Sequence, residues 1–196
     1  MSIQDLEFIA NSMSANSVSM GDWETLVHYA RGLDTVVELG TNIGSTSIIL
    51  SHCAKQVHTI DVFERLDLIE DTTQREMYKN HWQSNKHTYD GITKKLYFYP
   101  NIFVYQSLSH KAADEFTGES VDLIFIDADH SYKGVKKDFE HWFPKIKHGG
   151  KIAFHDVGPG CPVFDFYNEE LLKDTRIIEL PPVAITQTWT VVFAKV

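Results

Sequence analysis

The 196-residue sequence has only two cysteines, no long apolar run and an excess of negative charge. Cys53 and Cys161 lie far apart, without the spacing of a zinc site or a disulfide framework. Because neither a secretory signal nor a transmembrane-length apolar segment is seen, we predict a cytoplasmic protein with reduced thiols and no membrane partner. The net charge of -9 and the lack of a basic run argue against an extended nucleic-acid surface and leave open a small local RNA site.

Low-complexity segments and internal repeats are absent as well, so nothing in the sequence divides it. At this length the chain can bury a substantial core as one domain. We therefore predict a single domain over 1–196, with N-terminal helices over 1–33 and a core over 34–196. Apolar spacing in the core predicts alternating strands and helices, as in an α/β fold.

Individual elements follow from capping residues and apolar spacing. Ser19 with Asp22 predicts the start of a helix whose apolar face holds Trp23, Leu26, Val27, Ala30 and Leu33. Strands are expected at 35–39, 57–61, 102–106, 121–127 and 151–155, followed by an antiparallel hairpin of 176–180 and 188–194. One later helix is expected to end at about 54, a second to cover 65–85 and a last one to lie near 163–172. Between the last two, a helix is expected to bury Val135, Phe139, Trp142, Phe143 and Ile146 and to stop at Gly149-Gly150. A polar linker is predicted over 86–95, and Trp82, Tyr97, Phe98 and Tyr99 are expected to pack inside.

The most informative stretch is 35–47, where a short apolar strand leads into a Gly-x-x-x-Gly turn that opens a helix. Gly40 and Gly44 let the backbone approach a ligand and leave the first N–H groups of the helix free to bind it. The next strand ends at Asp61, whose carboxylate can accept both hydroxyls of a ribose. Ligands bind at the carboxyl ends of strands in open α/β sheets, so the two features together indicate an adenosine-containing ligand.

Two phosphate-binding motifs are missing from this turn. A dinucleotide fold uses Gly-x-Gly-x-x-Gly to place bare backbone against a pyrophosphate, whereas Thr41, Asn42 and Ile43 fill that gap here. The Walker A pattern with its Lys-Ser/Thr pair is absent too. A cofactor with ribose and adenine but no phosphate fits better, so the turn points to S-adenosylmethionine.

A second polar cluster follows two later strands. Asp127 and His130 come after one of them, and His155 and Asp156 come after the next. If these strands are parallel neighbours, the four side chains converge at one edge of the sheet. Carboxylates and imidazoles can ligate a divalent cation such as Mg²⁺, and an imidazole there can instead take a proton from a substrate hydroxyl.

These motifs resemble those of the class I S-adenosylmethionine-dependent methyltransferases, in particular the small proteins of the methyltransferase 24 family. The likeness covers nearly the whole chain and rests on 38–44, Asp61, 126–132, and 149–156. It implies an α/β, Rossmann-like, doubly wound and mostly parallel seven-stranded sheet with an antiparallel C-terminal strand and helices on both faces. It also implies S-adenosylmethionine lying over the first glycine turn.

The predicted cofactor-binding residues lie in these motifs and at the neighbouring strand ends: Glu38, Gly40, Thr41, Asn42, Gly44, Ser45, Asp61, Val62, Gln106, Ser107, Asp127 and Asp129. Several have a structural alternative. Glu38 can brace the turn, Asp129 can cap the helix that follows it, and Gln106 with Ser107 can simply begin a loop. Ser19 and Met20 are predicted, from related O-methyltransferases, to lie near the methionine end of the cofactor or the acceptor entrance.

The predicted catalytic residues are His130, Asp127 and Asp156. Cation-dependent O-methyltransferases, which the chain resembles more distantly, have a metal-binding Asp at the position of Asp127, an Asp-Asn pair where His155-Asp156 stands, and in the catechol-type enzymes a lysine base at the position of His130. This likeness makes Asp127, His155 and Asp156 candidate metal ligands and His130 the candidate base. Methyl transfer mainly needs an aligned nucleophile and excluded solvent, so a metal-free version is also chemically reasonable.

We therefore predict a methyltransferase that acts on a hydroxyl oxygen of a small-molecule or sugar-like acceptor. One alternative is a catalytically inactive protein that binds S-adenosylmethionine and uses the Asp127 cluster structurally. Another is a nicotinamide-dependent oxidoreductase, which the missing third glycine disfavours. The sequence leaves open a homodimer and the identity of the acceptor.

Overall fold

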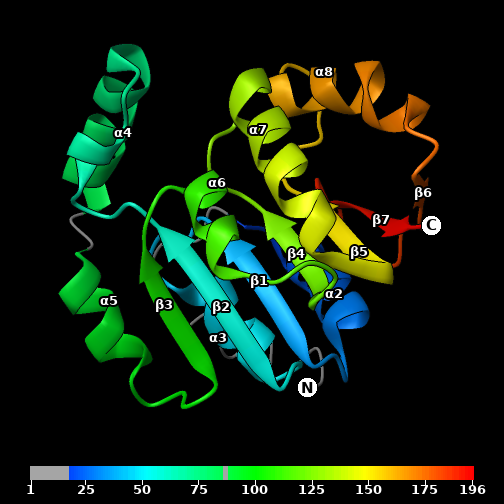
Figure 1. The fold of residues 1–196 in the computed structure, drawn as a ribbon, viewed down its shortest axis with the longest axis horizontal. Helices are drawn as coiled ribbons and strands as arrows, with labels where there is room; N and C mark the ends of the chain where they lie inside the picture. The colour runs from blue at the N-terminus through cyan, green and yellow to red at the C-terminus, as the bar shows by residue number, and fades with distance from the viewer. Residues whose placement is uncertain (1–17, 86–87) are drawn as a thin grey trace.

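Seven strands form one sheet in the computed structural model, which describes residues 18–85 and 88–196 (Figure 1). Their order across the sheet is β3-β2-β1-β4-β5-β7-β6. The strands are β1 (Thr35–Leu39), β2 (Gln56–Asp61), β3 (Ile102–Gln106), β4 (Val121–Ile126), β5 (Ile146–Phe154), β6 (Ile177–Glu179) and β7 (Val191–Lys195). The first five are parallel, and β7 runs antiparallel to both β5 and β6. The predicted Rossmann-like fold and its C-terminal hairpin are therefore confirmed.

Helices cover both faces of this sheet. They are α2 (Met20–Ala30), α3 (Ser45–Ser51), α4 (Thr72–Asn85), α5 (Tyr89–Leu96), α6 (Ser109–Ala112), α7 (Tyr132–Trp142) and α8 (Pro162–Glu169). Short 3₁₀ turns lie at Leu66–Leu68, Ala113–Glu115, Phe143–Lys145 and Leu171–Lys173. No helix among the described residues is both long enough and apolar enough to span a lipid bilayer.

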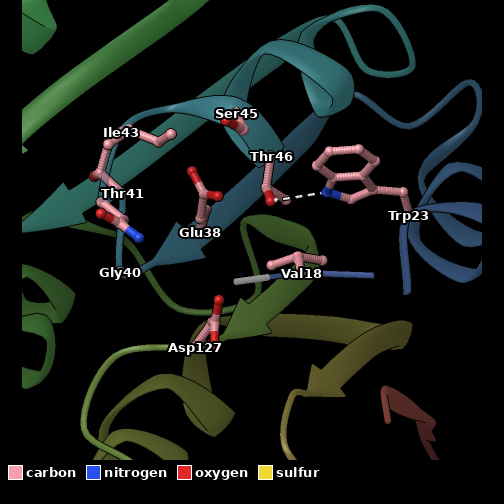
Figure 2. Close-up of a pocket in the computed structure, with 10 residues that line it drawn as sticks. Val18, Trp23, Glu38, Gly40, Thr41, Ile43, Ser45, Thr46 and Asp127 are labelled. Carbon is pink, nitrogen blue, oxygen red and sulfur yellow. Dashed lines mark hydrogen bonds between the residues drawn. The ribbon is translucent and has the colours of Figure 1, made fainter. Parts of the chain in front are cut away.

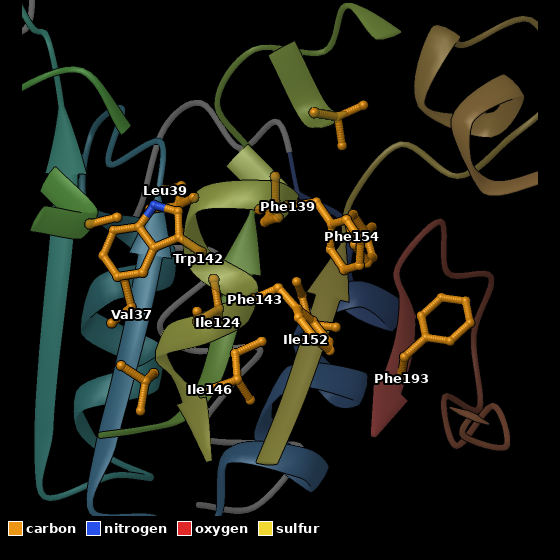
Figure 3. Close-up of a cluster of buried hydrophobic side chains, with 14 of the residues drawn as sticks. Val37, Leu39, Ile124, Phe139, Trp142, Phe143, Ile146, Ile152, Phe154 and Phe193 are labelled. Carbon is orange, nitrogen blue, oxygen red and sulfur yellow. The ribbon is translucent and has the colours of Figure 1, made fainter. Parts of the chain in front are cut away.

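Neighbouring residues of each central strand point to opposite faces, because strand side chains alternate. Val36 packs with α2 and α3, whereas Val37 packs with α6 and α7. The second face holds the larger cluster, in which Phe139 and Trp142 of α7 cover Ile124 and its neighbours (Figure 3). Burial on both faces explains why the central strands are continuous apolar runs in the sequence. The polar clusters follow these buried strands at their carboxyl ends.

Most predicted elements occur where the sequence indicates. Ser19 and Asp22 form the predicted capping box at the start of α2. The residues predicted to face inward from the helix after Asp127 are all buried, namely Val135, Phe139, Trp142, Phe143 and Ile146. Residues 1–17 of the predicted N-terminal helices lie outside the described residues, as does the side chain of Trp82.

Other predictions are wrong for identifiable reasons. The segment predicted as a polar linker contains α5, because Thr88 caps its start and its one apolar stripe, Ile92 and Leu96, packs against neighbouring elements. Gly149-Gly150 lies within β5 and does not end α7, which stops at Trp142 before a proline-containing 3₁₀ turn. Tyr97 and Phe98 are each 81% exposed, so only Tyr99 of this aromatic run packs inside.

Candidate active site

The turn between β1 and α3 forms one wall of an open pocket (Figure 2). Gly40 and Gly44 both have positive φ angles, +98° and +80°, which explains the glycine spacing of this turn. Gly44 is the residue before α3, and its backbone leads directly into the first turn of that helix. The pocket is lined by Val18, Trp23, Glu38, Gly40, Thr41, Asn42, Ile43, Ser45, Thr46 and Asp127.

Glu38 lies at the buried side of this pocket (Figure 2). Its Oε2 accepts hydrogen bonds from the hydroxyls of Ser47 and Thr59, and Thr59 in turn contacts the hydroxyl of Thr41. Burial raises the pKa of Glu38 to about 8, although the hydrogen bonds from Ser47 and Thr59 lower it. The nearby charges of Asp127 and Asp61 add to the rise. Glu38 is therefore mainly neutral at pH 7.

Two buried polar atoms in the pocket have no partner among the described residues: Oδ1 of Asn42 and Oγ of Ser45. A buried polar atom without a hydrogen bond is unfavourable in free energy, so these atoms favour occupation of the pocket by a polar ligand. Asn42 belongs to the Gly-x-x-x-Gly turn at the carboxyl edge of the sheet, and Ser45 is the first residue of α3 directly after it. This observation supports the predicted cofactor site, and the individual ligand contacts stay predictions.

Asp61 braces the glycine turn from the end of β2. Its Oδ2 accepts from the backbone N–H of Asn42 at 3.0 Å, and its Oδ1 accepts from that of Phe63 at 2.8 Å. Each carboxylate oxygen can accept more than one hydrogen bond, so a ribose contact is compatible with the brace. The predicted ribose role is not tested by this geometry.

The remaining predicted cofactor residues lie outside the lining of this pocket. Val62 is buried after β2, and Gln106 donates to Glu64. Ser107 donates its N–H to the carbonyl of Asp61. Asp129 is not a helix cap, because Ser131 caps α7 through the N–H of Gly134, while Asp129 accepts from Ser131 and Gln74.

Four lining residues were missed by sequence reasoning, namely Val18, Trp23, Ile43 and Thr46. Trp23 donates its indole N–H to Thr46 at 3.2 Å, and the two residues close one end of the pocket (Figure 2). The capping box at Ser19 marks the start of α2 but gives no signal of which residues pack against that helix. Val18 lines the pocket, and the predicted place of the neighbouring Ser19 and Met20 near the methionine end of the cofactor or the acceptor entrance stays a prediction.

The second polar cluster assembles as predicted at the ends of β4 and β5, which are parallel neighbours. His130 lies between two carboxylates, with Nε2 at 3.2 Å from Oδ1 of Asp127 and Nδ1 at 2.7 Å from Oδ2 of Asp156. Nδ1 of His155 lies 2.9 Å from Oδ1 of Asp127 and 3.3 Å from Oδ1 of Asp156, aligned with neither. Asp127 also lines the pocket, so it joins the two clusters.

Each imidazole of the cluster faces carboxylates through both ring nitrogens, because Nε2 of His155 also lies 3.4 Å from Oδ2 of Asp22. A neutral imidazole has only one N–H, so this arrangement favours the doubly protonated ring. Burial opposes this protonation in both rings, yet pairing with Asp127 and Asp156 raises the pKa of His130 to about 10, and pairing with Asp127 and Asp22 raises that of His155 to about 10. Burial would raise the pKa of Asp127, but the two histidines lower it.

This arrangement does not fit the predicted metal role of Asp127, His155 and Asp156. A ligating imidazole must offer an unprotonated nitrogen, whereas both nitrogens of His155 face carboxylates. Three of the four carboxylate oxygens of Asp127 and Asp156 face imidazoles. Within 18–85 and 88–196, no group of three or more His, Cys, Asp or Glu side chains is arranged to hold a metal ion.

Comparison with known proteins agrees with the fold and the two motifs. A family model described as a methyltransferase domain, that of the methyltransferase 24 family, matches residues 37–157, more than half of the chain. The chain therefore belongs to this family of class I S-adenosylmethionine-dependent methyltransferases. A curated relative, uncharacterized protein y4gI from Sinorhizobium fredii (strain NBRC 101917 / NGR234), is 44% identical over 47 residues, which are 24% of this chain and only 5% of that protein.

Solved structures share the fold at low sequence identity. A protein from Staphylococcus aureus assigned as a caffeoyl-CoA O-methyltransferase has a TM-score of 0.58 and 18% identity, covering 100% of this chain and 92% of its own. SMU.1697c from Streptococcus mutans, a proposed methyltransferase in complex with S-adenosylhomocysteine, gives 0.56 and 14%, covering 89% and 95%. An rRNA methylase from Streptococcus thermophilus gives 0.55 and 14%, covering 88% and 93%. These likenesses show the fold and leave the acceptor open.

Proposed function

We propose that the protein binds S-adenosylmethionine at the glycine turn and methylates a hydroxyl oxygen of a small-molecule or sugar-like acceptor without a divalent metal. One observation carries this proposal: Asp127 lines the pocket and is also part of the His130, His155 and Asp156 cluster. A cofactor site and a group of proton-transfer residues thus share one side chain. The direct continuity of the two sites favours catalysis over cofactor binding alone.

Residues of the pocket suit the cofactor chemically. Gly40 lies in the wall of the pocket, and Asn42 and Ser45 supply the two unpartnered polar atoms. Asp61 is proposed to accept from the ribose hydroxyls, and Asp127 to face the positively charged end of the cofactor. When bound, S-adenosylmethionine supplies an electrophilic methyl group on a positively charged sulfur.

Asp156 is the residue we propose as the base. Its side chain is 25% exposed, compared with 11% for Asp127, so it is the more accessible carboxylate of the cluster. Asp156 accepts the proton of the acceptor hydroxyl at Oδ1, while the acceptor oxygen forms its bond to the methyl carbon and the carbon–sulfur bond breaks. A hydroxyl oxygen becomes strongly acidic as it is alkylated, so a carboxylate is a sufficient base.

His130 is proposed to orient this base. The ring holds Oδ2 of Asp156 at 2.7 Å. Oδ1 lies 3.3 Å from Nδ1 of His155, which is not aligned to donate to it, so Oδ1 can still accept from the acceptor. Because pairing with two carboxylates raises its pKa to about 10, His130 carries a proton at neutral pH, and its predicted role as the base is not supported there.

Charge favours a small neutral acceptor over RNA. The cluster of Asp22, Asp127 and Asp156 with two protonated histidines has one surplus negative charge, and the chain has a net charge of -9. Phosphate groups are repelled by such a surface. One of the structural neighbours is an rRNA methylase, so RNA is included as an arm of the test.

Turnover of S-adenosylmethionine with catechol, caffeate, methyl glycosides and rRNA would test the proposal, run with and without a chelator. We expect methylation of a hydroxyl compound that survives chelation and is not increased by added Mg²⁺. Loss of activity on chelation with recovery on adding Mg²⁺ would refute the metal-free mechanism. Binding of S-adenosylhomocysteine without turnover would indicate the inactive binding protein, and tighter binding of NAD would indicate an oxidoreductase.

A further inference from the structure

Asp22 is a buried carboxylate whose contacts go well beyond capping α2. Only 2% of the residue is exposed. Oδ1 accepts from the hydroxyls of Thr188 and Thr190 at 2.8 and 2.9 Å and from the N–H of Trp189 at 2.8 Å. Oδ2 accepts from the N–H and hydroxyl of Ser19. The residue thus ties the start of α2 to the segment that precedes β7.

Beyond these donors, Oδ2 of Asp22 faces Nε2 of His155 at 3.4 Å. His155 is 5% exposed and follows β5, with its backbone N–H bound to the carbonyl of Ile126. The opposite side of its ring faces Oδ1 of Asp127 at 2.9 Å. Nδ1 of His155 is not aligned to donate a hydrogen bond, so Asp22, His155 and Asp127 form a bridge of charge contacts from α2 to the residue shared by the cofactor pocket and the cluster.

We propose that Asp22 and His155 are positioning residues, which hold the carboxylate of Asp127 in one orientation at the junction between pocket and cluster. Asp127 lies near the carboxyl groups of Glu38 and Asp61, and His155 faces it from the buried side as its cationic partner. Asp22 in turn faces the far side of the ring, so turning the ring away would separate a buried cation from two buried carboxylates. This inference rests on the proposed function, because it assigns a role to Asp127 in methyl transfer.

Nitrogen NMR of histidine-labelled wild-type protein tests the bridge without any turnover. At neutral pH we expect both ring nitrogens of His155 to carry protons, with the signals assigned by their loss in His155→Gln. A single protonated nitrogen on His155 would overturn the bridge, since a neutral ring carries no charge to pair with Asp22 and Asp127. This measurement stands even where a variant of Asp22 does not fold.

A matched pair of variants then separates positioning from stability. Asp22→Asn removes the charge facing His155, whereas Thr190→Val removes one hydrogen bond of Asp22 and leaves His155 untouched. For Asp22→Asn we expect kcat about 10- to 100-fold lower, the scale of a misplaced catalytic group, with S-adenosylhomocysteine affinity within about twofold. Thr190→Val should keep both values within about twofold of wild type.

Equal kcat values for the two folded variants would overturn the positioning role. A wild-type protein that methylates none of the acceptors would instead overturn the proposed function, and the NMR result would still decide whether the bridge exists. The two failures are therefore distinguishable.

Discussion

The backbone carbonyl of Asp127 packs against Gly40 so closely that a Cβ atom on residue 40 would lie 2.1 Å from its oxygen. The N–H of Gly40 donates to the carbonyl of Ile60, and the N–H of Asp127 donates to that of Leu39. The ends of three neighbouring strands thus meet at this glycine. The contact sets the separation between the proposed cofactor turn and the proposed catalytic cluster.

Gly40→Ala should destabilise the fold far more than Gly32→Ala. Both glycines have positive φ, but no atom lies within 4 Å of a Cβ at residue 32. Gly32→Ala should therefore cost about 1 to 2 kcal/mol from backbone strain alone. Gly40→Ala adds steric overlap of about 1 to 3 kcal/mol or more. Urea unfolding of the two variants measures the difference, and equal losses would show that the strand ends can separate to admit the side chain.

Much of the fold could be predicted because its signals are local. Apolar runs bounded by Gly40, Asp61 and Asp127 marked the central strands, and the alternation of strands with amphipathic helices indicated a parallel sheet. Convergence of Asp127 with His155 and Asp156 followed from that sheet, since parallel neighbours end at the same edge. The capping box of Ser19 and Asp22 was equally local.

Other features depend on contacts that sequence patterns do not record. The bridge between Asp22 and His155 joins residues far apart in the chain, so Asp22 could be recognised only as a helix cap. The raised pKa of His130 depends on carboxylates from two strand ends at once. The sequence does not show that both carboxylates face this ring, so it predicted His130 as a base. Helix α5 was missed because its apolar stripe is only two residues, Ile92 and Leu96.

Asp61→Ala should weaken the binding of S-adenosylhomocysteine. A hydrogen bond to a charged group contributes about 1.5 to 3 kcal/mol, which corresponds to roughly a 10- to 150-fold loss of affinity. The substitution also removes the brace on the N–H of Asn42, which adds to the loss. Calorimetry measures the affinity, and Asp67→Ala serves as the control because Asp67 is exposed and pairs with Arg65. Unchanged affinity for Asp61→Ala would exclude the ribose assignment.

Glu38→Gln should change the pH dependence of stability. Burial raises the pKa of Glu38 to about 8 in the folded protein, above its ordinary value of 4.5. The folded state therefore binds more protons than the unfolded state between these two values, and the free energy of unfolding falls as pH rises through that window. Glutamine cannot ionise, so the variant should gain stability relative to wild type from about pH 5 to 8. A difference in the free energy of unfolding between variant and wild type that stays constant across this pH range would show that Glu38 is ionised in the folded state.

The pH profile of kcat should distinguish Asp156 from His130 as the base. Because His130 keeps its proton until pH approaches its raised pKa of about 10, we expect a flat profile from about pH 6 to 9 and a fall as the ring loses its proton. A base at His130 would instead give a kcat that rises with pH over the same range.

Asp156→Asn should lower kcat by about 10²- to 10⁴-fold, the usual contribution of a general base, and leave S-adenosylhomocysteine affinity nearly unchanged. Asp165→Asn, at an exposed position on α8, is the matched control and should match wild type in both measurements. Normal turnover in Asp156→Asn would show that Asp156 is not the base.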